Sequence, residues 1–168
     1  MLNQKQLDEL LTTPSAKLVE DIGKIEGDIM ILGAGGTMGP SLCVLAANAV
    51  KAAGLRKRVI AVSRFSSEEA VKELRAAGVE IIRADLQKRE ELDALPEVEN
   101  VIYMAGRKFG TDGHEWETWG MNATLSAFVA EKFRRSRIVV FSSANIYSIA
   151  PVRNGGSSEE EPVVPVGE

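Results

Sequence analysis

The first strongly apolar run of the chain is followed by three glycines at every third position, Gly33, Gly36 and Gly39. Such a turn gives a tight bend at the first glycine, access for a phosphate at the second, and close helix–strand packing at the third. The helix that begins here offers free N–H groups and its positive dipole end to an anion. We therefore predict that this turn, with Thr37 and Met38, binds the pyrophosphate of a dinucleotide. A turn that serves packing alone is the alternative.

The end of the second apolar run bears on which dinucleotide is bound. It reads Val62-Ser63-Arg64, with no carboxylate where NAD-specific folds place an acidic residue for the ribose 2′-OH. The guanidinium of Arg64 is suited to pair with a 2′-phosphate in a bidentate way, and Ser63 can hydrogen-bond either ribose. These residues favour NADP over NAD. A solvated Arg64 that takes no part in binding is the alternative.

Apolar runs and helical segments alternate along the chain. Runs suited to buried strands span residues 28–32, 58–62, 79–83, 100–105 and 137–141, and helical segments span 40–53, 67–77, 88–95 and 116–134. Continuously apolar strands indicate burial on both faces. The pattern predicts an α/β fold with a Rossmann-type, doubly wound parallel sheet of about five strands.

Both ends of the chain depart from this pattern. Leucines at roughly helical spacing and the Thr13-Pro14-Ser15 break predict two short helices, so residues 1–27 form an N-terminal helical extension and 28–168 the nucleotide-binding domain. The stretch 154–168 holds glycines, serines, consecutive glutamates and prolines, and predicts no packed element. Within the domain, Trp116 and Trp119 are expected to anchor their helix, and Cys43 to lie in the core.

Two motifs carry a resemblance to a known family. The G-x-x-G-x-x-G spacing of the turn and the stretch Ile138-Val-Val-Phe-Ser142-Ser143-Ala144-Asn145-Ile146-Tyr147 resemble the short-chain dehydrogenase/reductase superfamily. The similarity is greatest to its extended branch of nucleotide-sugar epimerases and dehydratases, and it covers residues 28–168. It implies further site residues, which follow the third and fourth strands.

The resemblance implies contacts on both sides of the cofactor. Asp85 and Leu86 match an Asp-Leu pair that contacts the adenine in the family, with a helix cap as the alternative role of Asp85. Asn122 matches a recurrent asparagine that helps to organise the active site. Tyr103 stands where the family often has a histidine. The family tends to have small residues beside the cofactor after the fourth strand, a place taken here by Met104, Ala105 and Gly106.

The serine pair at the end of the fifth strand is where the resemblance implies catalysis. Ser143 would be the catalytic serine, hydrogen-bonded to the substrate oxygen during hydride transfer, and Ser142 would line the nicotinamide side. A simple turn is the alternative. Tyr147 does not match the catalytic tyrosine of the family, which lies further on in a Tyr-x-x-x-Lys motif. Counting on from Ser143 reaches the end of the sequence, so we expect a chain that stops before this motif and turns over little or no substrate.

Composition excludes several other classes of protein. The 168 residues, 45% of them hydrophobic, suit one domain with its own core. A net charge of −4 argues against nucleic-acid binding, and no apolar run approaches the ~20 residues that span a bilayer. The single cysteine, Cys43, cannot form a disulfide within the chain, which suits a cytoplasmic protein. The single histidine, His114, has no partner ligands for a zinc site.

Together these features predict the NAD(P)-binding portion of an epimerase, dehydratase or reductase that acts by hydride transfer at a carbinol or ketone. The substrate is expected to be a small molecule such as a nucleotide sugar. Arg107 and Lys108 are candidates to meet its anionic group, with a solvated loop as the alternative. A non-catalytic module that senses NADP(H), with residues 1–27 for docking, is the alternative. A homo-oligomer is compatible with either function, because an uncovered sheet edge favours association.

Overall fold

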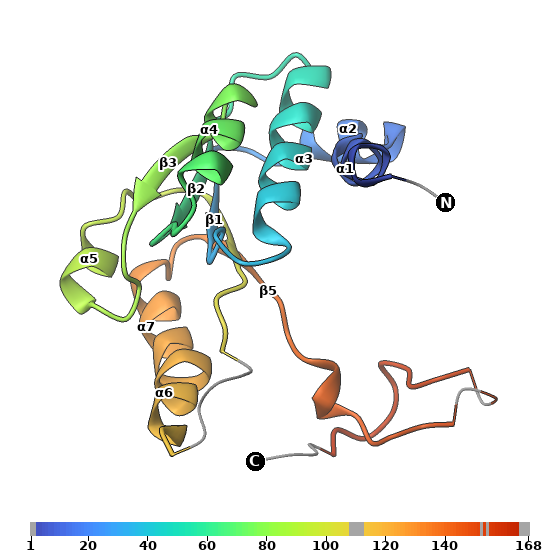
Figure 1. The fold of residues 1–168 in the computed structure, drawn as a ribbon, viewed down its shortest axis with the longest axis vertical. Coiled ribbons are helices and arrows are strands. Elements are labelled where there is room, and N and C mark those ends of the chain that lie inside the picture. The colour runs from blue at the N-terminus through green and yellow to red at the C-terminus, as the bar shows by residue number, and fades with distance from the viewer. Residues whose placement is uncertain (1–2, 108–112, 152, 154, 165–168) are drawn as a thin grey trace.

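The computed structural model describes residues 3–107, 113–151, 153 and 155–164 (Figure 1). Five parallel strands form one sheet in the order β3-β2-β1-β4-β5. They are β1 (Ile29–Leu32), β2 (Val59–Ser63), β3 (Glu80–Arg83), β4 (Asn100–Tyr103) and β5 (Arg137–Val140). The order confirms the predicted doubly wound sheet, and each strand lies within two residues of its expected span.

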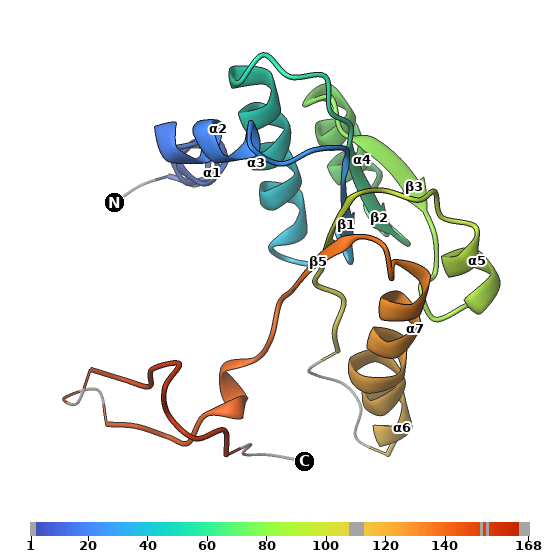
Figure 2. The ribbon, with the colours of Figure 1, turned by 180° about the vertical axis from the view of Figure 1, so that it is seen from behind.

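Helices cover both faces of the sheet, as Figures 1 and 2 show from opposite sides. One face carries α3 (Gly39–Ala52) and α4 (Glu68–Ala76), and the other carries α5 (Arg89–Asp93) and α7 (Leu125–Lys132). Strand β1 has Met30 and Leu32 in the core under α5 and α7, and Ile31 in the core under α3 and α4; all three are fully buried. Burial of successive residues on opposite faces explains why the central strands β1 and β2 are apolar, whereas the edge strands β3 and β5 begin with exposed Glu80 and Arg137. Cys43 is fully buried on α3, as expected.

The long helix after β4 is interrupted by a π-helical turn. Helix α6 (Glu115–Trp119) runs through the π-helix η1 (Gly120–Thr124) into α7. The prediction that the tryptophans anchor this helix was wrong, because Trp116 and Trp119 are each 69% exposed. The buried side chains are instead Leu125, Val129 and Phe133. Both tryptophans therefore lie on the solvent-exposed side of this helix.

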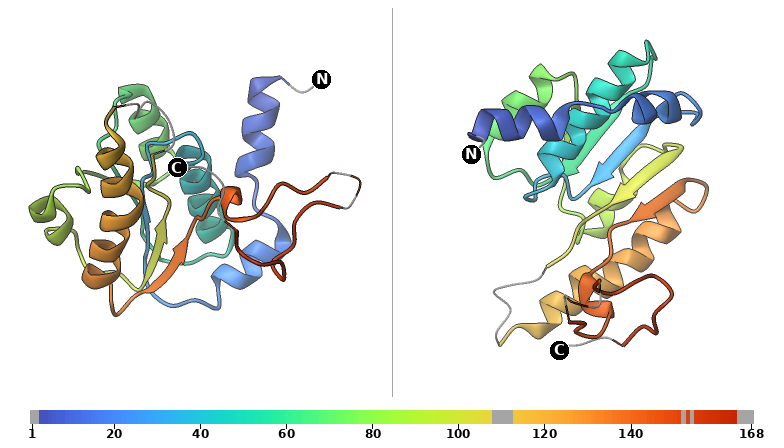
Figure 3. Two further views of the ribbon diagram at one scale, coloured as in Figure 1. Left: turned by 90° about the horizontal axis from the view of Figure 1, so that it is seen from below. Right: turned by 90° about the vertical axis from the view of Figure 1, so that its right-hand side faces the viewer.

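The chain leaves the sheet after β5. The Phe141 N–H still donates to the Tyr103 carbonyl across 2.9 Å, but the following residues extend away from the sheet (Figures 1 and 3). A short 3-10 helix, η2 (Ala144–Ile146), forms there, and the Val164 N–H closes the segment on the Ile146 carbonyl at 2.8 Å. Val139 on β5 is 59% exposed, because no helix of the described chain covers it.

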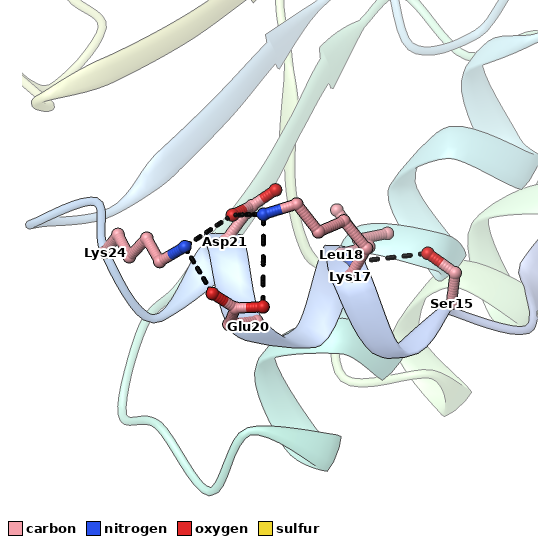
Figure 4. Close-up of polar contacts among 6 residues, drawn as sticks. All are labelled: Ser15, Lys17, Leu18, Glu20, Asp21 and Lys24. Carbon is pink, nitrogen blue, oxygen red and sulfur yellow. Dashed lines mark hydrogen bonds and ion pairs between the residues drawn. The ribbon is translucent and has the colours of Figure 1, made fainter.

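The N-terminal extension forms two helices, α1 (Gln4–Thr12) and α2 (Ala16–Ile22), which pack against α3. Asn48 of α3 donates its side-chain N–H to the Thr12 carbonyl at 2.8 Å, and Ile22 is buried. Figure 4 shows that the Ser15 hydroxyl caps α2 and that Lys17 and Lys24 flank Asp21 on its exposed side. Hydrogen bonds from these two lysines lower the pKa of Asp21.

Candidate functional site

A cleft of about 360 Å³ opens at the carboxyl ends of the strands. The strand order reverses at β1, and ligands of doubly wound sheets bind in the crevice at such a switch point. Residues that follow β1, β2, β3 and β4 all contribute to its wall. The lining residues are Gly33, Gly35, Gly36, Ser63, Arg64, Phe65, Ser66, Ala84, Asp85, Leu86, Met104, Ala105, Gly106 and Met121.

Two of the three spaced glycines are required by the packing of the protein itself. Gly33 has a φ of 90°, and a Cβ there would lie 2.6 Å from the backbone nitrogen of Ala105. A Cβ on Gly39 would lie 2.2 Å from the carbonyl oxygen of Ala34, inside the turn. No side chain fits at either place, so these two glycines fix the turn whether or not a ligand binds.

Gly36 is different, because nothing in the described protein requires a glycine there. The nearest atom to a Cβ at this position is the Gly33 carbonyl oxygen at 3.6 Å, an ordinary contact, and the residue lines the cleft. A glycine that packing does not require suits the close approach of a phosphate to the backbone. Helix α3 begins beside it, with Met38 at the N-cap and no capping side chain. The Gly39 N–H donates to the Gly36 carbonyl and Pro40 has no N–H, so the Ser41 N–H is the first of the helix that is left for an anion. Thr37 and Met38 are exposed beside the cleft but do not line it.

The end of β2 brings positive charge and hydroxyl groups to the cleft. Ser63 and Arg64, both predicted from the sequence, line it together with Phe65 and Ser66, which were not predicted. Arg64 is exposed, and no carboxylate of the described residues forms an ion pair with it. The one carboxylate that lines the described wall is Asp85, which follows β3 rather than β2.

Asp85 and Leu86 form the part of the wall that follows β3. The Asp85 carboxylate accepts a hydrogen bond from the Gln87 N–H at 3.2 Å. The backbone N–H of Asp85 donates to the Glu91 carboxylate at 2.7 Å. This backbone donation, followed by the hydrogen bond from Lys88, lowers the pKa of Glu91. Because the N-cap of α5 is Lys88, Asp85 does not cap that helix and remains part of the cleft wall.

The segment after β4 is held against the π-helix. Met104, Ala105 and Gly106 line the cleft, and next to them the Asn122 amide accepts the Arg107 N–H and donates to the Arg107 carbonyl, both at 2.8 Å. Buried Tyr103 donates its hydroxyl to the Met121 carbonyl at 3.2 Å. Burial raises the pKa of Tyr103, so this hydroxyl stays protonated as a donor. Asn122 thus fixes the backbone beside the cleft rather than lining it.

The serine pair lies apart from the cleft lining. Ser142 and Ser143 are exposed on the segment that leaves the sheet, and the Ser143 hydroxyl accepts the Asn145 N–H at 3.2 Å. Their catalytic role stays a prediction. Arg107 forms an ion pair with Glu117 at the start of the loop after β4, and Lys108 lies outside the described residues.

Sequence reasoning missed part of the cleft wall. The missed residues are Gly35, Phe65, Ser66, Ala84 and Met121. Most of them adjoin a predicted residue, so the strand ends signalled the region but not each side chain. At Gly35 the structure explains the absence of a side chain, because a Cβ there would lie 2.5 Å from the Ser63 hydroxyl oxygen.

Comparison with known proteins identifies the family. The sequence model of the NAD dependent epimerase/dehydratase family matches residues 29–167. The chain belongs to this family. A sequence search of curated proteins found no significant match. The family supports a nicotinamide dinucleotide as cofactor, and the glycine at position 36 of the cleft wall and the start of α3, which has no capping side chain, fit its phosphates.

Solved structures of the same fold are similar over part of their length. A short-chain type dehydrogenase/reductase from Mycobacterium marinum has a TM-score of 0.59 and 17% identity, over 79% of this chain and 62% of its own. A protein described as a short-chain dehydrogenase/reductase from Burkholderia xenovorans has a TM-score of 0.55 and 17% identity, over 70% of this chain and 57% of its own. The chain therefore spans about three fifths of these structures. No helix in the part that the structure describes is long and apolar enough to cross a membrane.

Proposed function

We propose that this chain is the cofactor-binding part of an oxidoreductase-type enzyme and that it binds NADP in preference to NAD. The observation that carries the proposal is the position of Arg64 in the cleft, beside Ser63 and Ser66, with no carboxylate at the end of β2. A guanidinium and two hydroxyls make a favourable environment for a 2′-phosphate, whereas the acidic residue of NAD-specific folds would repel it.

The other cleft residues have roles that follow from their chemistry. The backbone at Gly36 and the start of α3 would hold the pyrophosphate, and the apolar wall at Leu86, beside Asp85, would receive the adenine. Met104 and Ala105 would lie on the nicotinamide side. When bound, the nicotinamide supplies the hydride acceptor or donor.

Membership of the family supports a proposal for the reaction. We propose hydride transfer at a carbinol or ketone of a small molecule such as a nucleotide sugar, with Ser143 bonded to the reacting oxygen and Ser142 beside the nicotinamide. The two tyrosines of the chain, Tyr103 and Tyr147, are followed four positions later by Arg107 and Pro151, so the sequence contains no Tyr-x-x-x-Lys motif. The 168-residue chain is therefore expected to bind the cofactor without turning over substrate.

Calorimetric titration with NADPH and NADH tests the proposal. Loss of one charge-assisted pair costs about 1.5–3 kcal/mol, so Arg64→Ala should weaken NADPH binding by roughly 10- to 100-fold and leave NADH unchanged. Arg56→Ala is the matched control, because Arg56 is also exposed but lies between α3 and β2, away from the cleft. Equal affinity of the unaltered chain for NADPH and NADH, or binding of neither, would refute the NADP proposal.

A further inference from the structure

The loop that presents Arg64 has a strained backbone. Phe65 is the one non-glycine residue with positive φ in the described chain, at 47°. Its side chain is buried, 6% exposed, in the core under α3 and α4, and it also lines the cleft. The left-handed conformation is unfavourable for a residue with a Cβ, so other contacts must hold it.

Arg83, the last residue of β3, supplies those contacts. Its guanidinium donates to the Phe65 carbonyl at 2.8 Å and to the Arg64 carbonyl at 3.4 Å, and it forms an ion pair with Glu68 in the first turn of α4. Ser63 pairs with Arg83 in the register of β2 and β3, so the guanidinium reaches the loop from the neighbouring strand. One side chain therefore joins three points of the connection between β2 and α4.

We propose that Arg83 is a positioning residue for cofactor choice, which rests on the proposed NADP function. It does not line the cleft, but it fixes the carbonyl groups of Arg64 and Phe65, and hence the backbone that carries the Arg64 and Ser66 side chains. The loop cannot rotate away from the cleft without breaking these hydrogen bonds. A lysine cannot replace the planar fork, because its ammonium is a point charge that does not reproduce this geometry.

The effect of losing Arg83 should be local. The Ala84 N–H still donates to the Ser63 carbonyl at 3.1 Å, so β2 and β3 stay joined, and burial of the Phe65 ring does not depend on the guanidinium. Loosening should therefore be confined to the loop. NADPH, which uses Arg64, should lose affinity, whereas NADH should not.

The test compares Arg83→Lys with Glu68→Gln. The first keeps the positive charge and loses the fork, while the second removes the ion pair and keeps both bonds from Arg83 to the loop. Calorimetry measures the ratio of NADH to NADPH dissociation constants. Limited trypsin digestion without cofactor measures cleavage of the Arg64–Phe65 bond, identified by mass.

For Arg83→Lys we expect the ratio to fall by about fivefold and the cleavage rate to rise by about fivefold, as for loss of one hydrogen bond. Glu68→Gln should change neither by more than about twofold. Equal weakening of both cofactors, or an unchanged cleavage rate, overturns the inference. If the unaltered chain prefers NADPH and Arg64→Ala abolishes the preference but Arg83→Lys keeps it, the inference alone fails. If the unaltered chain shows no preference, the inference fails together with the proposed function.

Discussion

Replacement of Gly36 by alanine separates ligand binding from packing in the glycine turn. A Cβ at this position meets no atom closer than the Gly33 carbonyl oxygen at 3.6 Å, and Gly36 does not have a left-handed backbone. An unstrained Gly→Ala change stabilises a protein by about 0.4–1 kcal/mol, because it restricts the unfolded chain. The free energy of unfolding of Gly36→Ala should therefore be unchanged or raised by up to about 1 kcal/mol.

The same methyl group should impair cofactor binding. It adds bulk to the cleft wall where a phosphate would approach the backbone of Gly36, so a hydrogen bond from the Ser41 N–H at the start of α3 would lengthen. We expect NADPH affinity to fall at least about tenfold, equivalent to about 1.4 kcal/mol. Urea unfolding followed by far-UV circular dichroism measures stability, and calorimetric titration measures binding.

Gly39→Ala is the matched control in the same turn. Its Cβ would lie 2.2 Å from the Ala34 carbonyl oxygen and 2.5 Å from the carbonyl carbon, so the backbone must move. Overpacking of this kind costs about 1–3 kcal/mol, and the control should lose stability as well as binding. If Gly36→Ala instead lost more than about 1 kcal/mol of stability while NADPH affinity stayed the same, the turn would serve packing alone.

Three further predictions concern stability and reactivity. Tyr103→Phe removes the hydrogen bond to the Met121 carbonyl and should lower the free energy of urea unfolding by about 1 kcal/mol; no change would mean that water replaces it. Partial burial alone would raise the pKa of Asp28. Hydrogen bonds from the Arg58 N–H and guanidinium instead hold the pKa of this carboxyl below its ordinary value of 3.8. This stabilisation is full above the unfolded pKa and is lost as pH falls through the folded one, so the difference in Tm between the unaltered chain and Asp28→Asn should shrink below about pH 4. Burial raises the pKa of Cys43 to about 12, so its thiol should react with Ellman's reagent only after denaturation; rapid reaction of the native chain would contradict the burial.

The sheet was predictable because its signals are local. The central strands β1 and β2 are buried on both faces and apolar, and the edge strands β3 and β5 keep short apolar runs. Helical segments separate the strands, so their order along the chain was readable. The glycine turn was predictable for the same reason, since Gly33 and Gly39 are dictated by contacts within a few residues or at the adjacent strand end.

The site details depend on contacts between distant elements, which the sequence does not display. Met121 lies in the π-helix, and its carbonyl accepts the hydrogen bond from the Tyr103 hydroxyl. This hydrogen bond forms only once the π-helix packs on β4. The link from Arg83 to the loop at Phe65 depends on the pairing of β2 with β3. Neither is encoded in a local pattern. The serine motif of the fifth strand was readable, but the sequence did not show that Ser143 would lie apart from the cleft lining, on the segment that follows β5.

The cleft at the carboxyl ends of β1–β4 is the site that we propose for a nicotinamide dinucleotide. The most direct test is a titration of the ¹⁵N-labelled chain with NADPH, followed by amide chemical shifts. We predict shifts at Gly36, Arg64 and Asp85, and none at Lys51 beside the smaller cavity of about 270 Å³ under α3 and α4. Absence of shifts, or shifts confined to the smaller cavity, would contradict binding of the dinucleotide in this cleft.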